Sequence, residues 1–275
     1  IRLSLVGSEM CIRDRYYGGL VTDASGKQTV DDKAVAFSSD KNALYNDISM
    51  QYYLLRNISD VQVDVLDNHG NKVTTLSSSN NQTKTYYDST GRNYTYYRAP
   101  AWDGTYYDQR DGNIKTAADG NYTYRISGVP EGGDKRQTYD VAFTLDSKAP
   151  TVRHVALTSR QEKGKTTYYL TAEAKDDRSG LDATKSAKTS VNQVTNLDGT
   201  FTTTGTTADG YTKLETPLTD KQAQALGQGD NNVELYLTDN ASNATDQSAS
   251  AQKPGSTAYD LIINCLLYTS PSPRD

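Results

Sequence analysis

Short runs of this chain alternate apolar and polar residues with a period of two, and this pattern constrains the fold more than any other feature. The ranges 61–65 and 233–237 each place an aliphatic residue at every second position. Successive side chains of a strand point to opposite faces of a sheet, so each run predicts a strand with one buried face. Clusters of Asn, Asp and Gly separate the runs, and the cluster 67–71 is expected to join 61–66 and 72–76 as a hairpin. Asp-Gly pairs at 103–104, 111–112 and 119–120 mark further expected turns. The spacing of strands and turns predicts an all-β fold, built as two consecutive β-sandwich domains.

The composition supports this fold class and excludes several functions. The chain has 21 Tyr against 3 Phe and 1 Trp, and aromatic residues of this kind favour strands. Its net charge of −5 argues against a nucleic-acid binder, which would show a basic patch. The mean hydropathy of −0.74 and the lack of a long apolar run predict that this segment has no transmembrane helix. The turn-rich composition also excludes a helical bundle.

Both ends of the chain look foreign to the rest. The stretches LVGSEMCIRDR (5–15) and CLLYTSPSPRD (265–275) back-translate to the two strands of one oligonucleotide, as a transposase-type sequencing adapter would. We therefore expect 1–15 and 265–275 to be adapter-derived artefacts, and 16–264 to be an interior piece of a longer protein. The foreign ends carry four basic and three acidic residues, a net charge of +1, which leaves −6 for the natural segment.

The two cysteines, Cys11 and Cys265, fall in these foreign ends, so the natural segment has none. Extracellular animal modules of this size more often carry disulfides. A cysteine-free β protein rich in Tyr, Thr and Asn suits an extracellular, wall-attached protein of a Gram-positive bacterium.

The clearest domain boundary is the stretch from Asp146 to Pro150. A strand-like run ends before it, and proline favours extended backbone in itself and in the preceding residue. We place a first domain at 16–149, a second at 150–253 and a linker at 254–264. Within them, Thr219 to Leu226 is expected to be a helix, because Thr219 can cap its start and Gly227 can end it. The expected strands are 48–58, 61–66, 72–76, 83–87, 94–98, 121–126, 139–145, 152–158, 166–175 and 233–238.

The residues offer little for catalysis. The chain has two histidines, His69 in a predicted turn and His154 in a predicted strand. No serine lies in a Gly-x-Ser-x-Gly motif, and no phosphate-binding glycine loop or zinc-ligand spacing is present. We predict two structural or solvated histidines, and no catalytic, cofactor-binding or metal-binding residue in this segment.

Calcium is the one ion that the acidic residues leave open. In an immunoglobulin-like second domain, 166–175 is strand B and 233–238 is strand F, and the loops after both lie at one end. Five residues could then converge at the domain junction: Asp146, Asp176, Asp177, Asp239 and Asn240. The alternative is turn chemistry, because Asp and Asn side chains bond to their own backbone. A second acidic stretch, 38–47, is interrupted by Lys41 and Ala43, which makes an ion there doubtful.

Tyrosine pairs occur at 52–53, 86–87, 96–97, 106–107 and 168–169. In a strand, one member of each pair faces the core and the other faces solvent. Exposed rings near Trp102 could stack on sugars or hold a protein partner. The alternative is a half-buried ring whose hydroxyl reaches water.

Several of these motifs resemble one family. The stretch Asp47-Ile-Ser-Met-Gln-Tyr-Tyr-Leu-Leu-Arg-Asn57 with 61–66, then Trp102-Asp-Gly104 and 119–126, resembles fibronectin-type-III-like accessory modules. Those modules belong to Gram-positive cell-envelope subtilisin-like serine proteases, of the lactocepin and complement-cleaving peptidase types. The stretches 174–181 and 237–245 resemble the Ig-like module that follows. One departure is Ser39-Asp-Lys-Asn42, where the family usually has an Asn-Gly-Asp-Gly-like turn.

The resemblance implies a non-catalytic spacer within a secreted, wall-attached endopeptidase. The catalytic residues of the family lie in an upstream domain, so none is transferred to this chain. Implied partners are neighbouring domains of the same chain, and protein substrates or host proteins. Two alternatives stay open: the stalk of a surface adhesin without a protease, and a carbohydrate-binding module.

Overall fold

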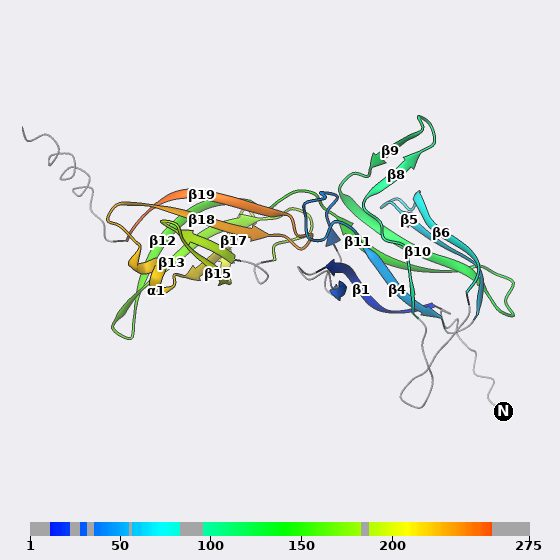
Figure 1. Cartoon of the computed structure of the whole chain (residues 1–275), viewed down its shortest axis with the longest axis horizontal. Coiled ribbons are helices and arrows are strands. Elements are labelled where there is room, and N and C mark those ends of the chain that lie inside the picture. The colour runs from blue at the N-terminus through cyan, green and yellow to red at the C-terminus, as the bar shows by residue number, and fades with distance from the viewer. Residues whose placement is uncertain are drawn as a thin grey trace, which may run out of the picture. The chain divides into compact units, whose positions relative to one another are not determined.

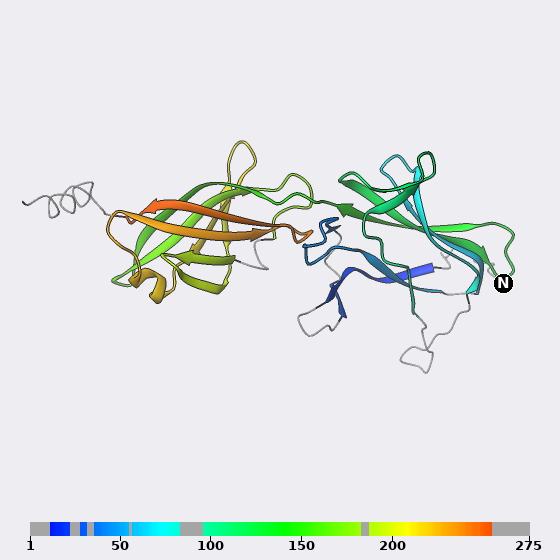
Figure 2. The same cartoon turned by 45° about the horizontal axis from the view of Figure 1, so that its top comes forward.

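The computed structural model describes residues 12–22, 28–31, 36–54, 57–82, 96–182 and 187–254. Regular structure in these residues is strand except for one short helix, as Figures 1 and 2 show. The chain forms two compact units. The first comprises the described residues up to Lys148 together with Asn240–Asn243, and the second comprises the remaining described residues from Ala149 onward. The expectation of an all-β protein is confirmed.

The first unit contains a four-stranded sheet of order β2-β1-β4-β7 and a five-stranded sheet of order β3-β11-β10-β5-β6. Neighbouring strands are antiparallel except β3 and β11, which are parallel. The strands are β1 (Ile12–Thr22), β2 (Gln28–Asp31), β3 (Ala36–Phe37), β4 (Ser49–Leu54), β5 (Ile58–Leu66), β6 (Lys72–Gln82), β7 (Tyr96–Arg98), β10 (Gly120–Pro130) and β11 (Gln137–Leu145).

Alternation in the sequence builds the core of this unit. Val61, Val63 and Val65 of β5 are each at most 2% exposed, as their period of two predicts. They pack in one cluster with aromatic rings of both sheets and of the connecting segments. Among these rings are Tyr124 of the neighbouring strand β10 and Trp102 of a connecting segment. The expected hairpin of 61–66 and 72–76 is confirmed as β5 and β6, which are joined at a turn after Asp67.

A small two-stranded sheet completes the first unit. It consists of β8 (Thr105–Asp108) and β9 (Asn113–Thr116), which form an antiparallel hairpin between β7 and β10 in the sequence. Gly104 and Gly112 have positive φ, which glycine tolerates without steric cost, so the expected Asp-Gly turns occur there. Gly120, the third expected turn glycine, is instead the first residue of β10.

The second unit packs two four-stranded sheets, β12-β13-β17-β16 and β15-β14-β18-β19. When the strands are lettered in chain order, with β15 as C′, the neighbours within the two sheets are A-B-E-D and C′-C-F-G. This is the arrangement of an immunoglobulin-like sandwich. The predicted strands B and F are therefore β13 and β18. The strands are β12 (Thr151–Glu162), β13 (Lys165–Lys175), β14 (Ala187–Val191), β15 (Val194–Gly199), β16 (Thr202–Thr206), β17 (Thr212–Pro217), β18 (Asp230–Thr238) and β19 (Ala244–Gln252).

The predicted helix is present as α1 (Asp220–Gln224), shorter than expected. The Thr219 side chain caps it by accepting from the Gln222 N–H. Gln222 Oε1 in turn accepts from the Thr219 N–H at 3.1 Å, which completes a capping box. Gln222 is fully buried and also donates to the Thr189 and Val194 carbonyls. The hydrogen bonds of this buried side chain thus attach the helix to β14 and β15.

Some expected strands differ from those observed. The range 48–58 is not one strand, because β4 ends at Leu54 and β5 begins at Ile58. The expected strand 94–98 is β7, which begins at Tyr96, while 83–87 lies outside the described residues. Several observed strands were not predicted, namely β1 to β3, β8, β9, β14 to β17 and β19. β1 begins at Ile12, so three residues that we assign to the adapter, Ile12, Arg13 and Asp14, pair with β4.

Candidate functional site

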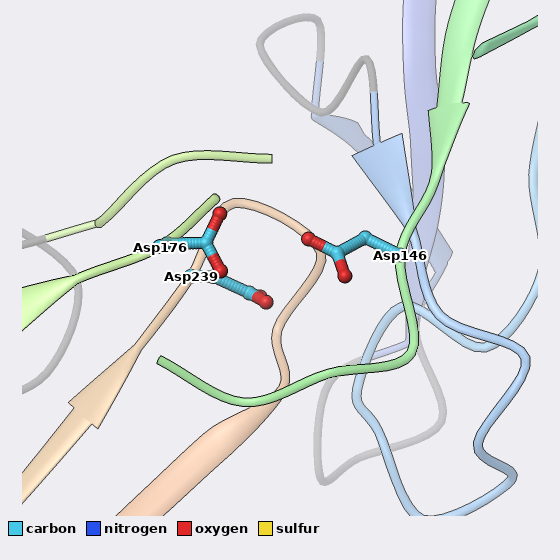
Figure 3. Close-up of side chains that lie close together, drawn as sticks. All are labelled: Asp146, Asp176 and Asp239. Carbon is cyan, nitrogen blue, oxygen red and sulfur yellow. The ribbon is translucent and has the colours of Figure 1, made fainter. Parts of the chain in front are cut away.

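Two of the aspartates considered as calcium ligands meet at one end of the second unit. Asp176 follows β13 and Asp239 follows β18, and their carboxylate oxygens lie within 4.8 Å of one another. An isolated bridge between Leu181 and Asp239 holds the chain after β13 beside the end of β18. Figure 3 shows both side chains at the ends of their strands.

The bonds of these aspartates are those of turns. Asp176 Oδ1 accepts from the backbone N–H groups of Arg178 at 3.0 Å and of Gly180 at 2.6 Å. Asp177 is exposed and pairs with Lys175 at 2.9 Å, so it does not join Asp176 and Asp239. The turn chemistry that we named as the alternative is therefore present. Calcium binding by Asp176 and Asp239 stays an untested hypothesis.

Asp146 and Asn240 belong to the first unit, and Figure 3 shows Asp146 just after β11. The Asp146 N–H donates to the Phe37 carbonyl at 2.9 Å, and its carboxylate accepts from the Lys148 N–H at 3.2 Å. Its carbonyl accepts from the Asn243 amide at 2.7 Å. Asp146 thus ends the last strand of this sandwich.

The acidic stretch 38–47 also makes a turn. Asp40 Oδ1 accepts from the Asn42 backbone and side-chain N–H groups at 2.9 and 3.0 Å. The Asn46 amide donates to the Lys41 carbonyl at 3.2 Å. Burial and, to a smaller extent, the neighbouring Asp103 raise the pKa of Asp47. These contacts hold the loop together through its own side chains.

His69 lies in the turn between β5 and β6, as predicted. Its backbone N–H donates to Asp67 Oδ1 at 2.8 Å, and the Asn71 N–H donates to the same oxygen at 2.8 Å. The side-chain hydrogen bond from Asn71 is the largest cause that lowers the pKa of Asp67. His69 is exposed and serves the turn through its backbone.

His154 belongs to a charged cluster that the sequence analysis missed. His154 Nδ1 lies 2.9 Å from Glu173 Oε2, and Arg153 Nε donates to the same oxygen at 2.9 Å. Arg153 also pairs with Asp209 at 2.7 Å, and its guanidinium lies 3.7 Å from the Tyr211 ring centroid. The cluster joins β12 to β13 and to the turn before β17. Its detection from sequence would need the β12–β13 register, which has an irregularity between Arg153 and Ala156.

The electrostatics of this cluster fit a structural ion pair. The hydrogen bond from Arg153 is the largest cause that lowers the pKa of Glu173, and Asp209 is the largest cause that raises the pKa of Arg153. A hollow of about 230 Å³ adjoins the cluster and is lined by His154, Glu173 and neighbouring side chains of β13, β16 and β17. Within the described part of the chain, Glu173 is the hydrogen-bond partner of the His154 ring.

Trp102 itself is not available for sugar stacking, which the carbohydrate-binding alternative would require. Trp102 is 2% exposed, and its Nε1 donates to the Thr105 carbonyl at 2.7 Å. Its ring packs edge-on against Tyr122 and Phe143, with centroids 5.1 and 5.8 Å away. The next tyrosine pair behaves as predicted, because Tyr107 is 61% exposed while its neighbour packs on the core.

No helix among the described residues is long and apolar enough to cross a membrane. Two β-sandwiches, the second of immunoglobulin-like strand order, place this chain in the class of fibronectin-type-III-like and immunoglobulin-like β proteins. No protein-family model matches the chain. Its sequence is 80% identical over 250 residues to the "PII-type proteinase" of Lacticaseibacillus paracasei and 79% identical to the "PIII-type proteinase" of Lactococcus lactis subsp. cremoris (strain SK11).

These matches cover 91% of this chain and 13% of each proteinase, so the chain corresponds to a small part of its relatives. The resemblance to cell-envelope proteinases is confirmed. A solved structure of Clostridium thermocellum CbhA fibronectin(III)-like modules is also similar, at 15% identity and a TM-score of 0.33, covering 88% of this chain and 92% of that one.

Proposed function

We propose that this chain is a non-catalytic accessory region of a secreted, wall-attached subtilisin-like serine endopeptidase. The region positions the protease domain and adds surface on which protein substrates or host proteins bind. The observation that carries the proposal is the 80% identity to a proteinase of which the chain spans 13%. The proposal assigns the chemistry of peptide cleavage to other parts of the parent protein.

The fold suits a positional role. Each unit has its own apolar core, and the two cores include Trp102 and Tyr124 in one case and Leu170 and Leu235 in the other. Domains with separate cores fold as separate rigid bodies, which makes them suitable spacers. The cell wall is the proposed location, the neighbouring domains of the parent chain are proposed partners, and no cofactor is proposed for the spacer role.

The most direct test is to sequence the DNA that flanks this segment in its source. An upstream reading frame that encodes a Ser/His/Asp protease domain supports the accessory-region proposal. Upstream immunoglobulin-like repeats without a protease would make the segment an adhesin stalk and overturn the proposal.

A functional test uses the parent proteinase of a close relative such as the Lacticaseibacillus paracasei enzyme. The 250-residue region is replaced by a flexible Gly/Ser linker of equal length, and both forms are displayed on the cell wall. We expect kcat/KM for a short soluble peptide to stay within about twofold, because binding energy lost outside the active site does not affect a small substrate. Cleavage of a large unfolded protein should fall several-fold. Equal cleavage of the large protein by both forms would contradict the role of this region.

The carbohydrate-binding alternative loses its main residue, because the Trp102 ring is buried. A pull-down on cell-wall glycans tests what remains of it. Saturable binding to glycan would support a sugar-binding module in place of a spacer.

A further inference from the structure

The β8–β9 hairpin presents an exposed, uncharged face to solvent. Tyr107 is 61% exposed and Ile114 is 74% exposed, and the two residues are direct cross-strand partners. Thr105 and Thr116 form the next pair on the same face, two residues along each strand. Figure 1 shows the hairpin extending beyond the large sheets of the first unit. Apolar side chains thus lie together on a surface that the core of this unit does not use.

The opposite face of the hairpin is firmly held. Asp108 is buried and binds Lys115 Nζ at 2.6 Å, and Lys115 also pairs with Asp111 at 2.7 Å. The hydrogen bond from Lys115 is the largest cause that holds the pKa of Asp108 well below its usual range. At the base of the hairpin, Trp102 Nε1 donates to the Thr105 carbonyl. An isolated two-stranded hairpin is marginally stable in water, and these contacts supply the missing support.

On the outer edge of β9, backbone groups point away from β8 and pair with no other strand of the described structure. The Ala117 N–H donates to the Gly104 carbonyl at 2.8 Å, which makes these residues a hydrogen-bonded pair of the ladder. Hydrogen-bonded and non-hydrogen-bonded pairs alternate in an antiparallel ladder. The N–H and C=O groups of Ile114 and Thr116 therefore point away from β8. In the described part of the chain, β8 is the strand that pairs with β9, and no other strand covers this edge.

An edge of this kind selects its occupant by geometry. Free donors and acceptors at every second residue match the backbone of another extended chain. A proline or a β-bulge protects many natural edge strands from pairing with another chain. β9 has neither, because it contains no proline and its pairing with β8 shows no register shift. Its lysine points to the inner face, where it is paired with Asp108. The exposed Ile114 and Tyr107 side chains then favour an occupant with apolar residues at alternate positions.

We propose that the β9 edge binds an extended, unfolded segment of a protein substrate, which adds to the hairpin as a third strand. This inference rests on the proposed function, because an accessory region of an endopeptidase meets unfolded polypeptide. Backbone pairing gives binding with little sequence dependence, and the Ile114–Tyr107 pair adds a preference for apolar side chains. The hairpin would thus hold a long substrate outside the active site.

The test measures direct peptide binding by the 275-residue chain, so it does not depend on the parent enzyme. The probe is a blocked peptide with alternating valine and threonine between terminal lysines, titrated by calorimetry. The control peptide carries N-methyl groups on the amides of one edge. We expect saturable binding of the first peptide and at least tenfold weaker binding of the second, because several backbone hydrogen bonds are lost.

Two variants localise the binding. Thr116→Pro removes an outward N–H without breaking the ladder to β8, and we expect roughly tenfold weaker binding. Ile114→Thr keeps strand propensity and removes apolar contact, so binding should fall several-fold. Leu197→Thr is the matched control, because Leu197 is 69% exposed on a strand of the second unit. Melting curves establish that all three variants are folded.

Three results would overturn the proposal. The first is no saturable binding, or equal binding of the N-methylated peptide. The second is an equal loss of affinity in the Leu197→Thr control. The third is concentration-dependent self-association that Thr116→Pro abolishes, because the occupant would then be a second copy of this chain. None of these results contradicts the accessory role, which is measured by cleavage in the parent enzyme.

Discussion

Replacing Trp102 with phenylalanine tests whether the core of the first unit supports the hairpin. Trp102 is the single tryptophan of the chain, and its ring contacts Phe37, Tyr122 and Phe143 at centroid distances of 5.1 to 5.8 Å. Phenylalanine keeps an aromatic ring in this cluster but removes the donor to the Thr105 carbonyl. The substitution therefore separates the hydrogen bond and the missing volume from the rest of the packing.

Two terms set the expected loss of stability. A carbonyl left without its donor costs about 1–3 kcal/mol. The smaller ring leaves a cavity on the order of 40 Å³, which costs about 1 kcal/mol at about 24 cal/mol per Å³. The free energy of unfolding of the first unit should fall by about 2–4 kcal/mol. For a unit of this size the melting temperature should fall by roughly 10 °C.

The assay is differential scanning calorimetry of the wild type, Trp102→Phe and the control Tyr107→Phe. Since the two units have separate cores, Trp102→Phe should shift the transition that wild-type tryptophan fluorescence reports and leave the other unchanged. Tyr107→Phe alters an exposed ring and should shift neither. A Trp102→Phe melting temperature equal to that of wild type would refute the reasoning, as would wild-type emission typical of a water-exposed indole.

Three further predictions concern a close contact, an ion pair and the calcium question. Gly128→Ala should destabilise the first unit by about 1–3 kcal/mol, because a Cβ there would lie 2.3 Å from Ile58 Cγ2; denaturant unfolding measures it. Glu173→Gln should flatten the loss of stability in acid. Arg153 lowers the pKa of Glu173 below 4.5, so the ionised form stabilises the fold above that pH, and this contribution is lost as the pH falls through and below 4.5; melting from pH 7 to 3 measures it. Millimolar calcium should leave the melting temperatures of wild type and of Asp239→Asn unchanged, because the Asp176 carboxylate is already bound by the backbone of its own turn.

Each of these has a clear contrary outcome. Gly120→Ala is the control for Gly128→Ala, since the nearest atom to its Cβ would lie at 3.7 Å, and equal destabilisation by both would show that contact distance is not the cause. Parallel acid melting curves of wild type and Glu173→Gln would remove Glu173 from the pH response. A rise of the wild-type melting temperature in calcium that Asp239→Asn abolishes would show instead that Asp176 and Asp239 bind the ion.

Strong periodicity predicted the parts of the fold that carry the cores. The β5 valines and the β18 leucine positions alternate, and the structure buries them at 2% exposure or less. The helix was predictable because Thr219 supplies a local cap. By contrast, β16 was missed because most of its residues are exposed threonines, so no buried face appears in the sequence. The edge strand β16 depends on pairing with β17, and this tertiary contact cannot be seen in the local sequence.

The candidate sites show the same division. The turn roles of Asp67 and Asp176 follow from local sequence, since each side chain bonds to backbone within four residues. The Arg153–Glu173 pair depends on strand register, and the burial of Trp102 depends on the rings around it. For an aromatic residue that begins a turn, as Trp102 does, exposure to solvent is therefore poorly predicted from sequence.

The β8–β9 hairpin connects these points to function. Asp103 accepts from the Thr105 N–H in the turn that begins the hairpin, a local contact that the Asp-Gly pattern indicates. Trp102 fixes the base from within the core, and the Asp108–Lys115 pair fixes the inner face. The bond to Asp108 holds Lys115 on the inner face, and no other strand of the described structure pairs with the outer edge of β9. Natural edge strands often carry a charge or a proline there. β9 carries isoleucine and threonine at its outward positions, which is the basis for proposing strand addition at this edge.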